Sequence, residues 1–584
     1  MVITLNKEIA DIFYKLAIFL EMDKVAFKSQ AHERAGAGLE ALKQDAGQIY
    51  EKGGLSALEQ IDGVGRGLAL KIEEYLKTGR LREYEAYKKR LPVNLDELLA
   101  VEGIGPQKVK FLYQKLGVTD LKSLAAAAKA GKIAMLPGFG KMSEENISQA
   151  IAFLSKSKGR FLLAEILPKA EEIVSWLKKL KEVKQISLAG SLRRMNETIG
   201  DVDILAVASN PAKVMDFFIN SPGVVKVWAT GRTKSSIRVG QGFDIDLRIV
   251  PAKSYGSALQ YFTGSKEHNI AVRVLAMRKG LKLNEYGLFQ GKKMIAGRTE
   301  KEVYRLLGLP YIEPETREDN GELESKRLLK LITLNEVKGD LHCHSEWASG
   351  EDSILEMAQA AMGLGYQYIG ISDHTKFLKI ENGLDEKRLA EQKKEIDTLN
   401  SKFKVQSSKF TILQGAEVNI LNDGRLDIND QALAKLDYVI AGVHSSLKMP
   451  KQKMTERIIR AMKNPYVKII SHPTGRLLMK RDEYQLDFDQ ILSAAKETGV
   501  ILEINSSPKR LDLNGQNIRR AKQAGVKMII NTDSHQKAQL EFMKYGVAQA
   551  RRGWAESKDI VNTLPLSGLL KIFSIPRERG ERKV

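Results

Sequence analysis

The sequence predicts a multidomain protein of α+β and α/β character, with a helical N-terminal region, a central region that mixes strands and helices, and a C-terminal distorted (βα)7 barrel. Three observations predict this fold class. Before residue 155, three segments place a G-x-G turn between apolar helical stretches. Two central strands carry paired aspartates, and seven apolar runs after residue 337 each finish on a polar residue suited to metal binding. A chain of 584 residues also exceeds one hydrophobic core.

The composition indicates an ordinary cytoplasmic protein. A single cysteine rules out a disulfide framework and suits a reducing compartment. Uninterrupted apolar segments fall short of the roughly 20 residues that span a bilayer. The N-terminus is acidic and amphipathic, unlike a secretion signal. We therefore expect a cytoplasmic location and no membrane partner.

Positive charge is concentrated in the middle of the chain. Residues 1–100 carry 15 Lys and Arg against 16 Asp and Glu, whereas residues 101–300 carry 32 against 17. Such a basic region favours a polyanionic partner, and nucleic acid is the usual one. A merely well-solvated surface is the alternative interpretation of the charge alone.

Three segments of the N-terminal third repeat one design: LEQIDGVGRGLALKIEEYL (58–76), LLAVEGIGPQKVKFLYQKL (98–116) and IAMLPGFGKMSEENISQAIAFL (133–154). The glycines let a ligand approach the backbone, and amides at the start of the following helix favour a phosphate. The repeats resemble helix-hairpin-helix motifs, which implies DNA binding without base reading by Gly63, Gly65, Gly103, Gly105, Gly138 and Gly140. A helical bundle with glycine C-caps is the alternative.

The middle of the chain carries carboxylates at period two. The stretch QISLAGSLRRMNETIGDVDILAVA (185–208) predicts a strand, a Gly-Ser turn with two arginines and a second strand; GFDIDLRIV predicts a further strand, so the paired aspartates are Asp201, Asp203, Asp244 and Asp246. Alternation places each pair on one face. Two magnesium ions held there would serve an in-line nucleotidyl transfer, and Ser191 and Arg194 are suited to a triphosphate. For an isolated D-x-D, a solvated strand edge is the alternative.

G-S, G-D-x-D and a later D-x-R in this order resemble the palm of family X DNA polymerases, and YGSALQYFTGSKEHNIAVRVLAMRKGLKLNEYGLF (255–289) resembles the nucleotide-binding subdomain of the polymerase beta type. The resemblance covers residues 1 to about 315. It implies that Asp201 and Asp203 bind both metal ions and that Asp246, which precedes Leu247 and Arg248, completes the catalytic one. The implied nucleotide contacts are Gly190, Ser191, Arg194, Tyr261, Phe262, Gly264 and Asn269, and the implied DNA contacts are Arg248 and Arg273.

The lyase nucleophile of the same family falls on Lys71. Release of a 5′ sugar-phosphate through a Schiff base needs an amine that its surroundings keep neutral. Gly67 stands where the family usually has a cation, so we expect an exposed helical lysine at position 71 and keep lyase chemistry as the alternative.

The C-terminal third predicts a barrel with a metal site at one end. Its seven runs are VKGDLHCH, YQYIGISDH, FTILQGAEVNI, LDYVIAGVHSS, VKIISHP, GVILEINSS and VKMIINTDSH, with helical segments between most of them. Ligands at the carboxyl ends of parallel strands gather on one face of a barrel. The expected set is His342, His344, His374, Glu417, His444, His472, Asp533 and His535, which suits zinc or manganese and phosphoester cleavage.

These motifs resemble the PHP (polymerase and histidinol phosphatase) domain, which many bacterial and archaeal family X polymerases carry at the C-terminus. The resemblance implies one ion on His342, His344, Glu417 and Asp533, a second on Glu417, His444 and His472, and a third on His374, His535 and an aspartate. Ser349 replaces that aspartate here, so occupancy of the third site is an open question and Asp352 is a weak substitute.

The predicted domains are residues 1–85 and 86–155 (helical DNA-binding), 156–250 (palm), 251–313 (nucleotide selection), 314–335 (linker) and 336–575 (PHP). The acidic stretch 310–327 predicts a connector that is either flexible or strapped to the surface. The expected function is short-gap filling in DNA repair, including base excision repair, joined to a 3′-to-5′ exonuclease or abasic-site endonuclease. The expected cofactors are Mg²⁺ or Mn²⁺ in the polymerase site and two or three Zn²⁺ or Mn²⁺ in the barrel; the expected partners are dNTPs and gapped or primer-template duplex DNA, bound by a monomer.

Three alternatives remain from the sequence. A small-molecule phosphatase fused to a template-independent nucleotidyltransferase keeps the folds and changes the substrate. A DNA-end-binding scaffold with decayed sites keeps neither activity. A polymerase whose barrel has reduced activity, or only a structural role, follows from Ser349.

Overall fold

The chain folds into two compact units, Met1–Lys158 with Met479–Arg481 and Gly159–Leu478 with Asp482–Val584. The computed structural model describes residues 2–42, 44–99, 101, 103–157, 159–240, 242–325, 328–405 and 409–574. Residue 575, the last of the predicted PHP range, lies outside these. Within them, no helix is both long and apolar enough to cross a membrane.

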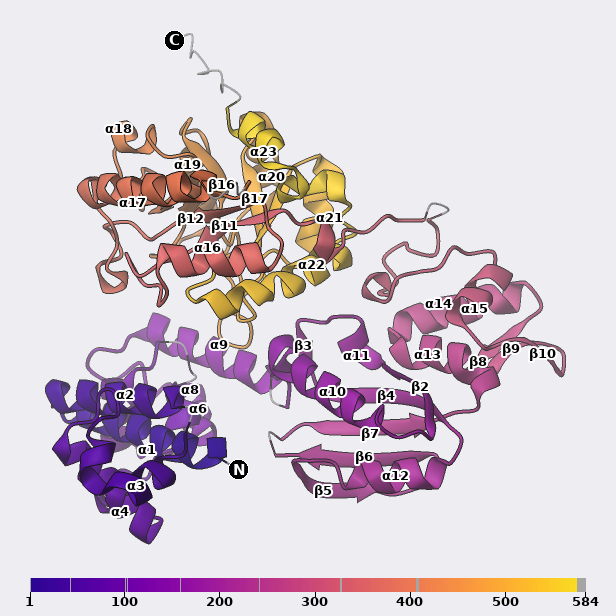
Figure 1. Ribbon diagram of the computed structural model, residues 1–584, viewed down its shortest axis with the longest axis horizontal. Coiled ribbons are helices and arrows are strands. Elements are labelled where there is room, and N and C mark those ends of the chain that lie inside the picture. Colours follow the sequence, from indigo (N-terminus) through magenta and orange to yellow (C-terminus); the bar gives the residue numbers. More distant parts are fainter. Residues whose placement is uncertain are drawn as a thin grey trace. The chain divides into compact units, whose positions relative to one another are not determined.

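The first unit is helical (Figure 1). Its helices are α1 (Val2–Met22), α2 (Ala26–Ala41), α3 (Ala46–Leu58), α4 (Arg66–Thr78), α5 (Arg82–Arg90), α6 (Leu95–Leu99), α7 (Pro106–Leu116), α8 (Leu121–Lys129) and α9 (Lys141–Ser157). One apolar core is formed by the four helices α1, α2, α3 and α4. A second is formed by the end of α1 together with α6, α7, α8 and α9. Amphipathic helices with apolar positions three and four residues apart produce both cores.

The central sheet has the strand order β2-β4-β7-β6-β5 (Figure 1). Its strands are β2 (Val183–Leu188), β4 (Asp201–Ala208), β5 (Val224–Ala229), β6 (Lys234–Val239) and β7 (Asp244–Ile249). Pairing is antiparallel except between β4 and β7, which run parallel. The accompanying elements are β1 (Phe161–Leu162), α10 (Leu163–Leu177), α11 (Gly190–Arg193), β3 (Thr198–Ile199) and α12 (Pro211–Ile219). Apolar side chains of α10 and α12 bury the alternate residues of the strands.

A smaller subdomain follows the central sheet. Its elements are η1 (Ala252–Ser254), α13 (Tyr255–Thr263), α14 (Lys266–Arg278), β8 (Lys282–Asn284), β9 (Gly287–Gln290), β10 (Lys293–Ala296) and α15 (Glu300–Leu306). The three short strands form an antiparallel sheet, and α14, α15 and these strands together form the core.

The segment after α15 packs as a strap. It contains the short helices η2 (Pro314–Thr316) and η3 (Leu334–Glu336). Arg317 has no exposed surface, and its Nη1 lies 2.6 Å from Glu300 Oε1. Glu322 is buried and lies 2.6 Å from His268 Nδ1. Of the two predicted forms of this connector, the described residues therefore show the strapped one, because buried charges fix it to the subdomain.

The barrel is built from parallel strands in two groups, β11-β12-β13 and β14-β15-β16-β17-β18. They are β11 (Gly339–Cys343), β12 (Tyr368–Ile371), β13 (Thr411–Gln414), β14 (Glu417–Asn419), β15 (Val439–Gly442), β16 (Val467–Ile470), β17 (Ile501–Asn505) and β18 (Met528–Asn531). Because β13 and β14 belong to one broken run, the seven predicted runs are all present. Isolated parallel bridges Cys343–Ser534 and His374–Glu417 join the groups, so the ring is distorted but closed.

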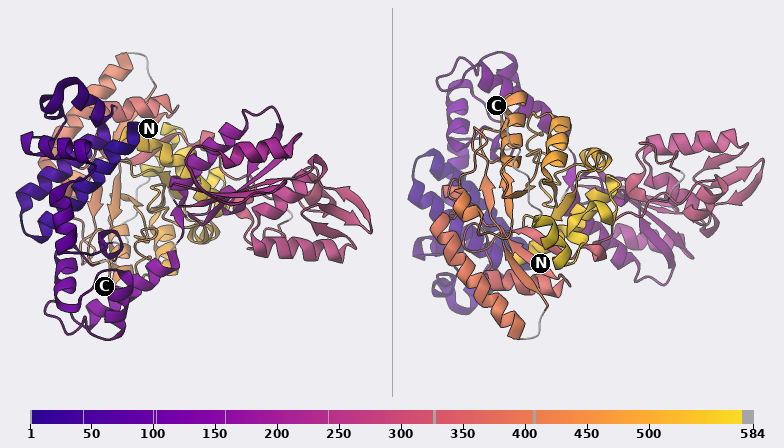
Figure 2. Two further views of the ribbon diagram at one scale, coloured as in Figure 1. Left: turned by 90° about the horizontal axis from the view of Figure 1, so that it is seen from below. Right: turned by 90° about the horizontal axis from the view of Figure 1, so that it is seen from above.

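Helices cover the outside of the barrel strands, as the orange and yellow segments show from two further directions in Figure 2. They are α16 (Ile354–Gly363), α17 (Glu386–Val405), α18 (Asp430–Leu433), α19 (Lys451–Met462), α20 (Phe488–Thr498), α21 (Gly515–Ala524), α22 (Met543–Arg552) and α23 (Leu566–Phe573), with the short turns η4 (Lys379–Glu381), η5 (Lys537–Phe542), η6 (Ser557–Asp559) and η7 (Val561–Thr563).

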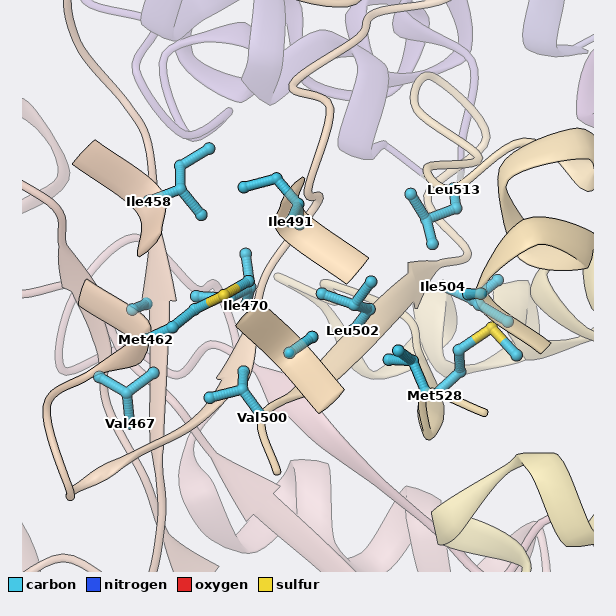
Figure 3. Close-up of a cluster of buried hydrophobic side chains, with 14 of the residues drawn as sticks. Ile458, Met462, Val467, Ile470, Ile491, Val500, Leu502, Ile504, Leu513 and Met528 are labelled. Carbon is cyan, nitrogen blue, oxygen red and sulfur yellow. The ribbon is translucent and has the colours of Figure 1, made fainter. Parts of the chain in front are cut away.

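Figure 3 shows a cluster of buried apolar side chains from the strands and the covering helices. Ile470, Leu502 and Met528 from three consecutive strands lie in the same buried cluster as Met462 and Ile491 from the covering helices. A strand buried on both faces reads as a continuous apolar run, which explains the seven runs in the sequence. The predicted fold class is confirmed.

Candidate metal centres

The register of two strands brings the predicted catalytic carboxylates together. β4 pairs with β7 so that Asp201 lies opposite Asp244 and Asp203 lies opposite Asp246. Since side chains alternate along a strand, all four carboxylates share one face of the sheet. The intervening residues are buried in the apolar core on the other face.

One of the four aspartates is already neutralised. Asp244 accepts hydrogen bonds from Arg238 Nε and Nη2 at 2.8 and 2.9 Å and from Trp228 Nε1 at 2.9 Å. Asp246 instead has a single lysine contact, with Lys234 Nζ at 2.8 Å. This difference agrees with the choice of Asp246 over Asp244 as the third metal ligand.

The remaining three carboxylates form a site that attracts cations. Burial first, and then the negative charges of Asp201 and Asp246, raise the pKa of Asp203 to about 6. Bringing a divalent cation between the carboxylates would remove this repulsion, and carboxylate oxygens are the ligands that Mg²⁺ and Mn²⁺ prefer. The donor set therefore fits the expected ion.

Glycine is required at the turn that faces these carboxylates. Gly190 begins α11 with φ +61°, and a Cβ built on it would lie 2.4 Å from Asp203 Oδ2. Any side chain would therefore meet both backbone strain and a carboxylate. Ser191 follows directly in α11, so the turn holds both predicted residues beside Asp203.

The two arginines after this turn have different surroundings. Arg193 forms a two-point contact with Glu300 at 2.7 and 2.8 Å and belongs to the buried network of the strap. Arg194, the predicted triphosphate ligand, contacts Glu318 Oε1 at 3.2 Å and donates to the carbonyl of Thr263. Arg194 is thus oriented toward the end of α13, where the nucleotide contacts are predicted.

The predicted nucleotide and DNA contacts of α13 and α14 lie in one cluster. Asn269 donates to the Tyr261 carbonyl at 2.7 Å, and Arg273 stands 5.7 Å from the Tyr261 ring. Arg248 of β7 lies 4.5 Å from the Phe262 ring, which links this cluster to the carboxylate strand. Gly264 ends α13 with φ +68°, so the turn is one that glycine adopts readily.

The barrel brings all eight of its predicted ligands together. Glu417 is central: its two carboxylate oxygens lie 3.0–3.3 Å from ring nitrogens of four histidines, namely His342, His374, His444 and His472. Asp533 Oδ1 lies 3.2 Å from His344 Nε2, and the rings of His344 and His535 stack with centroids 4.2 Å apart. Three overlapping groups can each hold an ion: His342, His344 and Asp533; His374, Glu417 and His444; and His344, His374 and His535.

Unsatisfied polar atoms show that this cluster fits metal ions. Among the residues the structure describes, the buried donors and acceptors without a hydrogen-bond partner include His342 Nε2, His344 Nδ1 and Nε2, His374 Nδ1, Glu417 Oε2, His444 Nε2 and His472 Nδ1. Leaving one such atom unpaired costs about 1–3 kcal/mol, and coordination would satisfy several at once. Burial, followed by the rings of His535 and His374, holds the pKa of His344 well below its usual range, so the ring is neutral, as a metal ligand must be.

Ser349 occupies the sequence position at which the family carries the aspartate of the third site. Its Oγ is buried, and within the described chain it has no hydrogen-bond partner. Asp352 cannot replace the missing aspartate, because its carboxylate is held by Lys537 through the backbone amide at 2.7 Å and Nζ at 2.8 Å. The three-histidine group is present, but its expected carboxylate is not.

The hairpin glycines share one backbone geometry. The first glycine of each pair has positive φ, +73° at Gly63, +86° at Gly103 and +82° at Gly138. The second precedes a helix, and no heavy atom of the described residues lies within 4 Å of a Cβ built there. The second glycines, Gly65, Gly105 and Gly140, are therefore open to close approach by a ligand backbone.

Lys71 is less exposed than the sequence predicted. Its side chain is 22% exposed, and its Nζ lies 2.7 Å from His32 Nε2 and 2.5 Å from Glu83 Oε2. Burial lowers the pKa of His32. The prediction of a free surface lysine was wrong, because Lys71 lies on the face of α4 that turns toward α2 and α5 rather than solvent.

Comparisons with known proteins match this division of the chain. Four family models match: a helix-hairpin-helix domain at residues 4–81, a SAM-like helix-hairpin-helix tandem at 95–152, a DNA polymerase beta thumb at 258–318 and a PHP domain at 340–507. The DNA polymerase/3′-5′ exonuclease PolX of Bacillus subtilis is 39% identical over 567 residues, which cover 96% of this chain and 98% of that protein. The chain belongs to the PHP-containing family X DNA polymerases.

Other relatives match one half of this family X polymerase each. DNA polymerase lambda of Rattus norvegicus is 29% identical over 294 residues, covering 44% of this chain and 48% of that protein. A probable phosphatase of Caldanaerobacter subterraneus is 32% identical over 211 residues, covering 34% of this chain and 75% of that protein. The predicted combination of a polymerase region with a phosphoesterase-type domain, both of metal-dependent kinds, is confirmed.

The sequence analysis of this family X polymerase missed residues that hold the metal ligands in place. Glu503 accepts from His342 Nδ1 at 2.7 Å and from the His472 amide at 2.8 Å, and Asn419 lies 2.8 Å from His444 Nδ1. Such partners fix the tautomer and orientation of ligand histidines. Their signal was present, because both residues end strand runs, but a carboxylate behind a ligand is not distinguishable from a ligand by its place in the sequence.

Proposed function

We propose that this protein is a DNA repair polymerase that fills short gaps and processes 3′ ends with its barrel as a 3′-to-5′ exonuclease. The observation that carries the proposal is the presence of two separate ligand clusters, Asp201, Asp203 and Asp246 on the central sheet and the histidine cluster of the barrel. The Bacillus subtilis relative is named for a polymerase and a 3′-5′ exonuclease activity, and we assign one cluster to each.

In the polymerase site, Asp201, Asp203 and Asp246 would hold Mg²⁺ or Mn²⁺. When bound, such ions lower the pKa of an attacking hydroxyl and stabilise the leaving pyrophosphate. Of the chain's own groups, Ser191 and Arg194 would orient the triphosphate through charge-assisted hydrogen bonds. Tyr261, Phe262 and Asn269 would position the sugar and base beside them.

In the barrel, the eight ligands would hold two or three Zn²⁺ or Mn²⁺. Bound ions of this kind supply a hydroxide nucleophile and neutralise a phosphodiester. The chain's contribution is to orient the histidines: Glu503 holds His342 and Asn419 holds His444.

DNA would be held by elements outside both clusters. The open glycine turns at 63–65, 103–105 and 138–140 are suited to backbone phosphates of a duplex, and Arg248 and Arg273 would contact the primer-template near the nucleotide. We assign residues 1–85 and 86–155 to DNA binding, 156–250 to catalysis and 251–313 to nucleotide selection.

One gap-filling experiment tests the proposal. A 3′-labelled and a 5′-labelled primer in a gapped duplex are incubated with and without dNTPs, first in Mg²⁺ and then in Mn²⁺. Asp201→Ala should abolish extension and leave shortening of the primer, and His342→Ala should do the reverse. Asp244→Asn is the matched control on the same strand face and should keep extension. Loss of both activities in both variants, or of neither, would overturn the proposal.

A second candidate for the barrel is reduced nuclease activity. Ser349 favours it, because a neutral hydroxyl is a weak ligand where the family carries a carboxylate. In that case extension would be normal and shortening of the primer slow in every metal.

A second candidate for the first unit is removal of a 5′ sugar-phosphate by Lys71. The contact with His32 places an imidazole beside the amine, which favours it, whereas the Glu83 carboxylate at 2.5 Å stabilises the charged ammonium and opposes it. Borohydride trapping on incised abasic DNA should be lost in Lys71→Ala and kept in Lys77→Ala, whose side chain on the same helix is 59% exposed. Equal trapping in both variants would remove this candidate.

A further inference from the structure

A cavity outside both metal clusters lies where the central sheet, the strap and the barrel meet within the second unit. It has a volume of about 740 Å³ and is lined by residues of the loop before β3, the strap and three barrel segments. Cavities of roughly 300–1,000 Å³ commonly hold small molecules in proteins. None of the predicted catalytic or ligand residues lines it.

The lining carries an excess of arginine. It contains five arginines and two glutamates, Arg160, Arg476, Arg519, Arg520, Arg552, Glu197 and Glu318. Glu197 pairs with Arg476 at 2.7 and 3.1 Å, and Glu318 lies 3.1 Å from Arg552. The cavity therefore keeps a positive balance of three charges even with both carboxylates ionised.

The other three arginines, Arg160, Arg519 and Arg520, contact neither glutamate of the lining and are held in place by other groups. Arg160 donates from Nε to Thr198 Oγ1 at 2.8 Å. Arg519 stacks on the Trp554 ring at 3.7 Å and donates to the carbonyl of Asn320. Arg520 contacts Asp489, whose side chain is 81% exposed. Held guanidinium groups lose little freedom when they bind a planar anion.

Two buried guanidinium nitrogens of the lining have no partner. Among the described residues, Arg476 Nε and Arg552 Nε are buried and make no hydrogen bond. Arg476 is only 7% exposed, so water reaches little of it. A buried donor without an acceptor is costly and adds to the uncompensated positive charge beside the cavity.

The rest of the lining suits a phosphorylated nucleoside. The ten-residue helix α21 begins at Gly515, and Asn514, Gly515 and Gln516 line the cavity, so the positive end of the helix is at its wall. Amide side chains such as Gln523 can pair with base edges, and the Arg519–Trp554 stack offers a flat face. Phosphate is an anion that both forked arginines and a helix N-terminus bind.

We infer that this cavity binds the phosphate of a nucleotide, either free or within a single strand. The inference goes beyond the proposed function, since neither activity requires an occupant there. Two of its lining residues lie close in the sequence to residues of the metal sites: Thr198 precedes Asp201 by three residues, and Arg476 follows His472 by four. A nucleotide bound here would touch loops that belong to the polymerase and to the nuclease.

Photocrosslinking of the full chain tests the inference. One arm uses 8-azido-dATP as the free nucleotide, and the other uses a single-stranded oligonucleotide with 4-thiothymidine; labelled peptides are mapped by mass spectrometry. We expect label on peptides containing Gln516, Gln523 or Trp554. Label in the first arm identifies a free nucleotide, and label in the second identifies a strand.

Variants decide whether the arginines hold the ligand. The double variant Arg519→Gln with Arg520→Gln should reduce labelling of these peptides at least five-fold. The control is Arg460→Gln on α19, whose guanidinium donates to the Asp423 carbonyl outside the cavity, and it should leave labelling unchanged. In the oligonucleotide arm, the slope of log Kobs against log salt should fall by about 0.7 for each phosphate contact removed.

A second variant distinguishes loss of the ligand contact from a folding defect. If the double variant melts at a lower temperature than the parent, Arg160→Gln, which removes a lining arginine from a distant part of the sequence, should still reduce labelling. No label on the cavity peptides in either arm, or labelling unchanged in folded variants, would overturn the inference. Extension and shortening of a gapped duplex are measured separately, so failure here leaves the proposed function standing.

Discussion

The two metal centres of this family X polymerase differ in how much of each site is already built by the protein. The central sheet offers carboxylates: Asp201 is exposed, and Asp203 and Asp246 are partly exposed. The barrel offers mostly buried imidazoles, oriented by further buried groups such as Glu503. From this difference we infer that the first site can take up an ion together with its substrate, whereas at the second site a bound ion would satisfy ligand atoms that are buried inside the protein.

The largest expected effect is a difference between the two sites in how well they retain metal ions. We expect protein passed over a desalting column without added metal to keep at least two transition-metal ions per chain, because several imidazole and carboxylate ligands converge there in fixed positions. Elemental analysis should show near-complete loss of these ions in His342→Ala with His444→Ala. Asp201→Asn with Asp203→Asn should lose none. Equal loss in both pairs would remove the distinction.

Glu300 differs from Glu417, because its buried carboxylate pairs with arginines, which are always charged, rather than with histidines. Glu300→Gln should lower the free energy of unfolding of the second unit by about 3–5 kcal/mol, because Arg317 and Arg193 lose their partner in the core. In calorimetry, the midpoint temperature of the transition in which the second unit unfolds should fall. Glu267→Gln, which changes an exposed glutamate on α14, is the control and should shift it little.

The pH dependence of this contact follows from its charge. Burial alone would raise the pKa of Glu300, but Arg317 and then Arg193 lower it to about 2, against 4.5 in a free chain. A carboxyl group with a lowered pKa in the folded protein stabilises it above the free value and loses that effect as pH falls toward the folded one. The stability difference between parent and Glu300→Gln should therefore shrink between about pH 4.5 and pH 2. A difference that stays constant over this range would contradict the assignment.

Orientation of the barrel ligands should be worth less than the ligands themselves. Glu503→Gln should weaken metal binding about 10–100-fold, the usual effect of removing a carboxylate that holds a ligand histidine. Competition with a chelator gives the affinity. Glu497→Gln, at the end of α20 and outside the cluster, should leave it unchanged.

The smallest effect is expected at Ser349. Ser349→Asp should add a carboxylate to His344, His374 and His535 and raise the metal content by up to one ion per chain. Shortening of a labelled primer should become a few-fold faster. An unchanged metal content would show that the three histidines already hold an ion, or that the loop keeps position 349 away from it.

The sequence was informative wherever a pattern had a fixed period. The D-x-D spacing predicted the shared face of Asp201 and Asp203, and strand ends predicted the histidine and carboxylate residues that the structure brings together in the barrel. The role of Arg193 was not predictable, because its partner Glu300 is 107 residues away and only packing joins them. The contact of Lys71 with His32 was missed for the same reason, since helix periodicity gives a face but not the neighbour that covers it.

The buried arginine of the strap affects how such an enzyme could be taken apart. A chain cut at residue 313, where the sequence suggests that the polymerase half ends, would lack Arg317 and leave Glu300 with one cation instead of two. Recombination that exchanged the barrel at that point would carry off a piece of the donor's interior. A workable module boundary lies further along, beyond Glu322, and swapping of nuclease halves between relatives is confined to junctions that respect it.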